Sequence, residues 1–346
     1  MKRVFSVWSS CTPSLICLRP SPLPHIHKHR SGHAVSNLRN ATFTLILTNL
    51  ILATSAAHAA DRPIHAPLFK PWINGVSGGE PQMQVQRYDD DTYVIRQSIR
   101  TNFEGPFLYL LFGSDRALLI DTGAGGLTVR PTIDRVIADW ATRHHRISIP
   151  LIVSHSHSHG DHHQGDAEFQ DRPDTVVVGL YPRDVAEFFK ITDWPNQIVA
   201  YDLGGRVLDI IPTPGHQSAH IMILDRKTRL LFSGDSLGPY RLYIPMNEAK
   251  TYCDSIDRVA TFTRDLHVSW ILGAHIEMTT KPGTLIPDEA LTHPDEHVLE
   301  ISYSNLPELQ TALHAMGGNL LRQAHRDFVI FPKPAREQQP FAPPPQ

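Results

Sequence analysis

The segment of this sequence that says most about fold and function is Ser154-His155-Ser156-His157-Ser158-His159-Gly160-Asp161-His162-His163-Gln164-Gly165. It directly follows 149–153, an apolar run of strand length. His157 and His159 are two residues apart, so on an extended chain they share a face and could chelate one cation. Asp161 and His162 come immediately after, where a turn could aim them at a second cation. Imidazole and carboxylate ligands together suit zinc, and also iron or manganese.

Three more candidate ligands each follow an apolar run of strand length. They are His216, Asp235 and His275, the last residues of the segments Thr213-Pro214-Gly215-His216, Phe232-Ser233-Gly234-Asp235 and Leu272-Gly273-Ala274-His275. A layered sheet displays its functional residues on the loops that follow its strands. The repeated placement therefore predicts a shared site and weighs against the alternative, a solvated His-rich loop that binds metal only adventitiously.

Strand and helix patterns alternate through the rest of the chain. Helical periodicity is expected over 128–144, 250–266 and 306–316. Strand-length apolar runs are 107–112, 117–120, 149–153, 175–178, 207–211, 220–224, 230–232 and 270–272. Early strands come in hairpin-like pairs and later ones are separated by helices. This order predicts two sheets with helices packed outside, a layered α/β fold.

The order of the motifs resembles the metallo-β-lactamase superfamily. Strand-H-x-H-x-D-H is followed by Pro-Gly-His, then Gly-Asp, then a final Ala-His. The resemblance extends from about Tyr88 to His275 and includes Leu119-Ile120-Asp121-Thr122-Gly123, which is similar to an early strand motif of that family. It implies a four-layer αββα sandwich with a metal site at one edge of the two sheets.

The same resemblance implies a site for two divalent metal ions, most simply Zn²⁺, with iron or manganese as alternatives. The implied ligands are His157, His159 and His216 for the first metal, Asp161, His162 and His275 for the second, and Asp235 as the bridge. A hydroxide held between the metals would be the nucleophile, and the first metal would polarise the substrate carbonyl. Asp161 is the catalytic residue because it would also orient the hydroxide. Asp121 is expected to support a ligand rather than to bind metal.

Five residues near these motifs match no ligand position. His155 and His163 are expected to be supporting or solvated, and His220 to be structural. Tyr240 and Tyr243 follow Asp235 closely. Either phenol could donate a hydrogen bond to a substrate oxygen, but tyrosines are usually at least half buried, so a packed aromatic is the alternative.

The resemblance implies a hydrolase. Gly234-Asp235 is intact, as in hydroxyacylglutathione hydrolases (glyoxalase II type) and acyl-homoserine lactonases, whereas true β-lactamases of the superfamily generally carry Cys or Ser in that region. This favours hydrolysis of an ester, lactone or thioester carbonyl in a small-molecule substrate. The alternatives are a β-lactam hydrolase, a phosphodiesterase or sulfatase-type hydrolase, and a non-catalytic periplasmic zinc-binding protein. Complete ligands for two metals and an oriented Asp161 favour catalysis over storage.

The first 59 residues are predicted to be an N-terminal extension and signal peptide. They hold six basic residues and no acid, since the first acid is Asp61. Arg39 precedes the apolar run 41–57, and Ala57-His58-Ala59 follows it, which predicts cleavage after Ala59 and export to the periplasm or the medium. Polar residues interrupt the run, and a bilayer span needs about 20 mainly apolar residues, so no stable membrane span is expected after cleavage. An uncleaved anchor and a cytosolic protein are the alternatives.

Composition sets the remaining limits. The 346 residues carry 32 Lys+Arg and 35 Asp+Glu, a formal charge of −3, so nucleic-acid binding is not expected. Only Cys253 lies beyond the signal peptide, which excludes an intrachain disulfide in the mature chain. Residues 60–87 are predicted to form an N-terminal arm, 88–331 the hydrolase domain, and 332–346 a Pro-rich disordered tail. The oligomeric state is not readable from the sequence.

Overall fold

The structure, a computed structural model, describes residues 66–342. The predicted signal peptide and its cleavage site lie outside these residues. Within 66–342, no helix combines the length and the apolar character that a membrane crossing requires.

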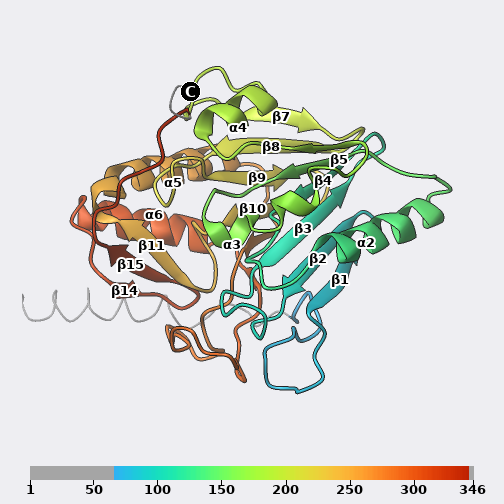
Figure 1. Cartoon of the computed structure of the whole chain (residues 1–346). Coiled ribbons are helices and arrows are strands. Elements are labelled where there is room, and N and C mark those ends of the chain that lie inside the picture. The colour runs from blue at the N-terminus through green and yellow to red at the C-terminus, as the bar shows by residue number, and fades with distance from the viewer. Residues whose placement is uncertain (1–65, 343–346) are drawn as a thin grey trace, which may run out of the picture. The chain divides into compact units, whose positions relative to one another are not determined.

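Two six-stranded sheets and a small third sheet form the framework (Figure 1). The first sheet has the order β1-β2-β3-β4-β5-β6, with β1 Met83–Asp89, β2 Thr92–Gln97, β3 Phe107–Phe112, β4 Ala117–Ile120, β5 Leu151–Ser154 and β6 Thr175–Val177. The second has the order β13-β12-β10-β9-β8-β7, with β7 Val199–Asp202, β8 Val207–Pro212, β9 Ile221–Asp225, β10 Leu230–Gly234, β12 Trp270–Gly273 and β13 Glu300–Ile301. The third has the order β11-β15-β14, with β11 Arg241–Pro245, β14 Gln323–Ala324 and β15 Val329–Lys333.

Alternate residues of each central strand enter different cores. On β3, Phe107 and Tyr109 pack in the core between the two large sheets, whereas Leu108 and Leu110 pack beneath α2 (Arg130–Arg143). On β9, Ile223 faces the core between the sheets, while its neighbours Met222 and Leu224 pack with α5 (Ala249–Thr263) and α6 (Asn305–Met316). Strands buried on both faces read as continuous apolar runs, which is why the sequence revealed them.

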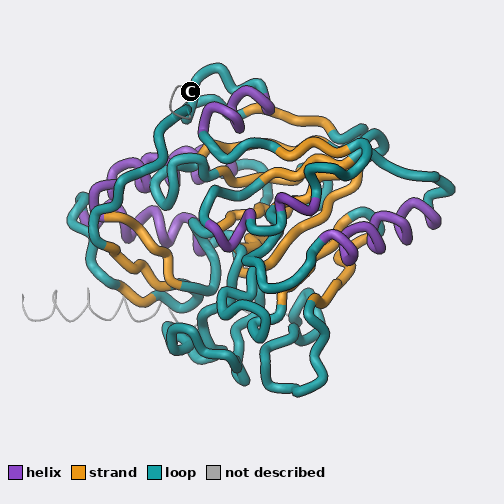
Figure 2. The backbone as a smooth tube through the Cα atoms, in the orientation of Figure 1, coloured by secondary structure: helices purple, strands orange, loops and turns teal. Residues whose placement is uncertain are grey.

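The resulting order is helix, sheet, sheet, helix, with α2 outside the first sheet and α5 and α6 outside the second (Figure 2). This is the predicted four-layer αββα sandwich. The three predicted helices are present, with ends within three residues of expectation. The structure adds short elements that the pattern did not predict: α3 Gly160–His163, α4 Pro182–Phe189, η1 Asp166–Glu168 and η2 Met246–Glu248.

The domain boundary predicted at Tyr88 falls inside β1, and part of the predicted arm belongs to the sandwich. Phe69 and Trp72 are buried in the core between the sheets. The glutamines of β1 bind this segment, because Gln84 accepts a hydrogen bond from the backbone N–H of Ile73 and Gln86 from that of Lys70. An edge strand that uses polar side chains in this way has no apolar run, so periodicity did not detect it.

The chain end also differs from the predicted tail over 332–346. β15 extends to Lys333, and residues 334–342 are placed against the rest of the fold, with the backbone N–H of Arg183 donating to the carbonyl of Phe341 over 2.7 Å. Pro-rich composition indicates only that such a segment builds no core of its own.

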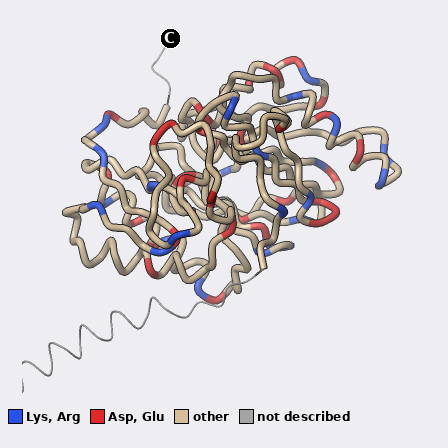
Figure 3. The backbone as a smooth tube through the Cα atoms, turned by 90° about the horizontal axis from the view of Figure 1, so that it is seen from below, with Lys and Arg blue, Asp and Glu red and all other residues tan. Residues whose placement is uncertain are grey.

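Charge is mixed along the described chain. In the view of Figure 3, basic and acidic positions alternate along the tube without a long stretch of one sign.

Candidate metal centre and active-site cavity

The structure brings all seven predicted ligands together, each on a segment that directly follows a strand. His157 and His159 lie on the loop after β5, and Asp161 and His162 on the short helix α3. The loops after β8, β10 and β12 carry His216, Asp235 and His275. These ligands fall into two groups, each close enough to hold one ion.

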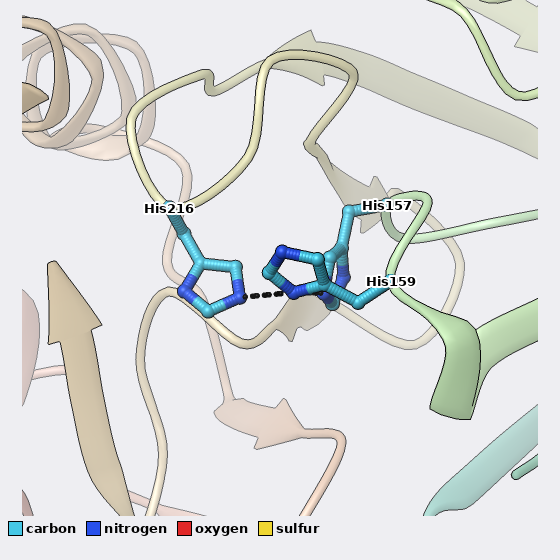
Figure 4. Close-up of side chains that lie close together, drawn as sticks. All are labelled: His157, His159 and His216. Carbon is cyan, nitrogen blue, oxygen red and sulfur yellow. Dashed lines mark hydrogen bonds between the residues drawn. The ribbon is translucent and has the colours of Figure 1, made fainter. Parts of the chain in front are cut away.

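The first group consists of His157, His159 and His216, which point toward one another (Figure 4). His159 Nδ1 lies 2.9 Å from His157 Nε2 and 3.0 Å from His216 Nε2. Zinc–nitrogen bonds of about 2.0–2.1 Å in tetrahedral geometry separate ligand atoms by about 3.3 Å, so the three nitrogens are near that spacing. His216 Nδ1 donates to the carbonyl of Tyr243 over 2.8 Å, which leaves its Nε2 for the site.

Burial keeps the imidazoles of this group neutral. It lowers the pKa of His157 well below its usual value, and the neighbouring His162 adds to the effect. Burial and the nearby His216 lower the pKa of His159 to about 4. Burial also lowers the pKa of His216, against the opposing charge of Asp235. Neutral imidazole is the form that binds metal, so these three side chains hold no proton that a cation must displace.

The second group consists of Asp161, His162, Asp235 and His275. Asp161 Oδ2 lies 3.0 Å from His162 Nε2 and 3.3 Å from His275 Nε2. Burial disfavours a charged His275, but Asp235 and Asp161 outweigh burial and raise its pKa to about 10. The same balance, with Asp161 as the main opposing charge, raises the pKa of His162. Without a cation, these imidazoles carry the positive charge that balances the two carboxylates.

Asp235 stands between the two groups. Its Oδ2 lies 3.6 Å from His216 Nε2 and 3.8 Å from His157 Nε2. Its Oδ1 lies 3.4 Å from His275 Nε2 in the second group and is buried without accepting a hydrogen bond from the described residues. A buried carboxylate oxygen that accepts no hydrogen bond is costly. The donor set therefore fits two divalent cations bridged by this carboxylate.

Asp121 orients one ligand from beneath. Its Oδ2 accepts from His162 Nδ1 over 2.9 Å, and its Oδ1 accepts from the backbone N–H of Ser156 over 2.7 Å. The residue occupies the left-handed region with φ 68°, which Asp and Asn tolerate better than most residues. It thus supports His162 and the ligand loop, in agreement with its predicted role.

We expect Asp121→Asn to weaken divalent-metal binding at the second group by about 10- to 100-fold, because an amide has one acceptor oxygen and cannot accept hydrogen bonds at both positions as the carboxylate does. Asn keeps the size and the backbone conformation, so the change isolates the carboxylate. Competition with a chelator measures the affinity. Asp166→Asn is the matched control, since Asp166 Oδ1 lies 2.8 Å from Nε2 of His155, which lies outside both ligand groups. Equal affinities in the Asp121 variant and the wild type would contradict this role.

The remaining histidines of the region lie outside both ligand groups. His220 is fully buried, with Nδ1 2.7 Å from Thr213 Oγ1 and Nε2 3.2 Å from Ser236 Oγ, so it supports the loop of Asp235. This loop needs Gly234, which has φ 51°: a Cβ there would lie 2.7 Å from His220 Nε2. His163 is half-buried and packs against the ring of His155.

The two tyrosines occupy different positions. Tyr240 is buried and its hydroxyl donates to the carbonyl of Gly234 over 2.5 Å, so it packs beneath the Asp235 loop. Tyr243 is half-buried, and its ring packs on Phe331 at a centroid distance of 5.3 Å. Both contribute to the wall of a cavity above the metal ligands. Of the two, Tyr243 has the phenol whose hydrogen-bond donor is not already engaged within the described residues.

This cavity has a volume of about 320 Å³. Its lining contains Glu104, His159, Asp161, His216, Asp235, Tyr240, Arg241, Tyr243, His275, Glu277, Lys333 and Arg336. Sequence reasoning missed Glu104, Arg241, Glu277, Lys333 and Arg336, because none belongs to a motif and distant segments bring them to the site. Burial raises the pKa of Glu104 to about 7, opposed by His275 and assisted by Asp161. The ligand groups thus open onto a polar cavity with several charged walls.

Comparison with known proteins matches part of the chain to a family. Residues 102–247 match the metallo-beta-lactamase superfamily. The chain is 29% identical over 138 residues to a hydroxyacylglutathione hydrolase of Rhizobium meliloti (strain 1021), covering 37% of this chain and 52% of that protein. It is 25% identical over 200 residues to an acyl-coenzyme A thioesterase, MBLAC2, of Bos taurus, covering 49% of this chain and 72% of that protein.

Among solved structures, a metallo-beta-lactamase from Pontibacter korlensis aligns with a TM-score of 0.45 and 17% identity over 67% of this chain and 99% of that chain. The sequence match to the R. meliloti protein spans about half the length of that relative. The matched residues 102–247 include six of the seven predicted ligands, and the fold brings His275 to the other six. Residues 102–247 are therefore a metallo-beta-lactamase superfamily segment, and the curated relatives that the chain matches are named as a hydrolase and a thioesterase.

Proposed function

We propose that this chain is an exported, binuclear metal-dependent hydrolase that cleaves thioesters, with related esters and lactones as secondary substrates. The observation that carries the proposal is the position of Asp235, whose two oxygens face two different groups of ligands. One carboxylate placed in this way can balance two cations at once. A protein that only stores metal needs neither this bridge nor the cavity that opens onto it.

Two divalent cations at these groups would supply Lewis acidity toward a carbonyl oxygen and would acidify water enough to furnish a nucleophile near neutral pH. The protein's own groups do the rest. Asp161 lines the cavity and holds a carboxylate oxygen 3.3 Å from His275 Nε2, where it can accept a hydrogen bond from a water and orient that water. Asp121 and the carbonyl of Glu104 keep His162 and His275 pointed into the site.

The preference for thioesters rests on the named relatives. Hydroxyacylglutathione and acyl-coenzyme A differ in their acyl and thiol parts but share the thioester bond. Thiolate is a better leaving group than alkoxide, so a site that delivers an oriented water suits this bond. The cavity of about 320 Å³ holds the reacting group and part of each side of the substrate.

The test is turnover by the purified, zinc-loaded protein on a panel of thioesters, lactones, aryl esters, phosphodiesters and a chromogenic cephalosporin. We expect thioester hydrolysis that disappears with chelator and returns with zinc. Turnover of the cephalosporin or of a phosphodiester with inactive thioesters would replace the proposed substrate class. Two bound metals without any turnover would favour metal handling instead.

Metal loading should depend on pH in two distinct ways. The first group is neutral near pH 7, whereas His162 and His275 must lose protons before they can bind a cation. We therefore expect the second metal to bind more weakly as pH falls, by about tenfold per pH unit for each displaced proton, while the affinity of the first metal changes less. Calorimetric titration at pH 6 and pH 8 measures both steps. Two steps with the same pH dependence would contradict the assignment of the protonated imidazoles.

Export is the second part of the proposal and rests on the basic, apolar and Ala-His-Ala segments before Asp61. A fusion of residues 1–65 to a reporter that is active only outside the cytoplasm tests it. An active reporter with a new N-terminus at Ala60 supports export with cleavage. A reporter that stays inactive would place the enzyme in the cytoplasm.

A further inference from the structure

Two basic side chains in the cavity wall come from the end of the chain. Lys333 is the last residue of β15 and Arg336 follows three residues later. The third cation of the wall, Arg241, is already paired with Glu277 at 3.3 Å and Asp288 at 2.9 Å. Within residues 66–342, neither Lys333 nor Arg336 forms an ion pair with a carboxylate. Both charges are therefore available to a ligand in the cavity.

The position of Lys333 follows from strand pairing. β15 runs parallel to β11, with Phe331 opposite Tyr243 and Lys333 opposite Pro245. The alternate residues Leu242 and Ile330 are buried in the core beneath, so the opposite face of both strands turns toward the cavity. On that face Lys333 Nζ lies 4.1 Å from the centre of the Tyr243 ring and 5.3 Å from that of Phe331. These aromatic faces hold the ammonium group at the wall.

The backbone of Arg336 is held as well. Its N–H donates to Asn247 Oδ1 and its carbonyl accepts from Asn247 Nδ2, both over 3.0 Å. These two bonds place the residue beside the short helix η2, and Arg336 contributes to the cavity wall.

Residues 333–342, here called the C-terminal strap, are anchored on the loops that carry the first ligand group. Gln339 Oε1 accepts from Ser158 Oγ and from Gln217 Nε2, both over 2.9 Å. Ser158 lies between His157 and His159, and Gln217 follows His216. In Figure 1 the strap is the dark red segment that leaves β15 and runs up toward α4. The strap thus crosses the site beside the ligands.

We propose that Lys333 and Arg336 form an anion-binding subsite of the active cavity, which takes a carboxylate or phosphate group on the thiol part of the substrate. The inference rests on the proposed thioester hydrolysis and extends it to the choice of thiol. Glutathione carries carboxylates and coenzyme A carries phosphates, so anionic groups are what the two relatives' named substrates have in common. The other charges of the wall, apart from the paired Arg241, are carboxylates and histidines of the metal site and Glu104 and Glu277, which leaves these two cations for the anion.

The experiment compares the wild type with the double variant Lys333→Gln, Arg336→Gln on three thioesters of one acyl group: with glutathione, with coenzyme A and with the neutral thiol N-acetylcysteamine. We expect the double variant to raise KM for the anionic thioesters by about 10- to 100-fold, with kcat and the neutral thioester within about twofold of wild type. A higher KM for the glutathione thioester alone identifies a carboxylate site, and a higher KM for the coenzyme A thioester alone identifies a phosphate site. An equal rise in KM for all three thioesters, or no rise for any of them, would overturn the subsite.

Arg322→Gln is the matched control. Its guanidinium lies 5.2 Å from the centre of the Phe331 ring but does not line the cavity, so it should leave all three KM values unchanged.

A binding measurement separates this inference from the proposed reaction. Calorimetry with S-methylglutathione and desulfo-coenzyme A, which carry the anions but no thioester, is made on the zinc-loaded wild type and the double variant. Binding by at least one probe that weakens about 10- to 100-fold in the variant supports the subsite even if no thioester is hydrolysed. Absence of binding to the wild type, or equal affinities, would overturn it whatever the hydrolysis assay shows.

Discussion

Asp235→Asn should lower hydrolysis by about 1,000-fold or more and reduce metal content below two ions per chain. Its carboxylate faces both ligand groups, with Oδ2 toward His216 and Oδ1 toward His275. An amide is neutral and offers one acceptor oxygen, so it cannot balance two cations. Loss of several kcal/mol of charge stabilisation corresponds to this size of effect, at about 1.4 kcal/mol per tenfold change in rate.

Metal analysis after dialysis, with kcat/KM on the substrate found in the panel, measures both consequences. Asp254→Asn is the control, because Asp254 pairs with Lys250 on the exposed face of α5. A variant that keeps two ions and wild-type turnover would contradict the bridging role. Circular dichroism establishes that the variant is folded.

Asp161→Ala should also abolish hydrolysis, but with a different metal content. Asp161 contacts only the second group, and the three imidazoles that form the first group stay in place. We therefore expect about one retained ion per chain and a rate reduced by about 1,000-fold or more, because the variant loses both a ligand and the carboxylate that orients water.

His163→Ala is the matched control for this change, since His163 lies on the same short helix but outside both ligand groups. Its activity should stay within about threefold of wild type, as expected for a side chain that only packs near the site. An unchanged rate in Asp161→Ala would refute the role assigned to Asp161. Loss of both ions in that variant would mean that the two groups do not bind independently.

The depressed pKa values of the Asp235 and Asp161 carboxylates fit these expectations. Burial opposes ionisation of Asp235, but His275 and His162 hold its pKa below the usual range. His162 and His275 do the same for Asp161. Both carboxylates are therefore anionic at every pH where hydrolysis would be assayed. Substitution of Asp235 or Asp161 removes a negative charge and not only a hydrogen bond.

Much of the site could be predicted from the sequence because its candidate ligands occur in short local motifs. His157, His159, Asp161 and His162 lie within six residues, and each other ligand directly follows a buried strand. Each of the eight predicted apolar runs coincides with a strand to within two residues at either end. β2 is also buried along its whole length but was not predicted, because Thr92, Arg96 and Gln97 leave only three apolar residues in a row. The edge strand β1 left no such run, since its glutamines bind backbone groups of residues 70–73.

The sequence by itself determined the family resemblance, the layered fold and the set of candidate ligands, because these depend on residue types at short spacing. Tertiary structure alone decided which oxygen of Asp235 faces which group and which cations reach the cavity. Gln339 bonds Ser158 across 181 positions, and Glu104 accepts from His275 across 171. Pairings between residues so far apart in the sequence come from the packing of whole layers. The Pro-rich composition of the C-terminal strap does not indicate them.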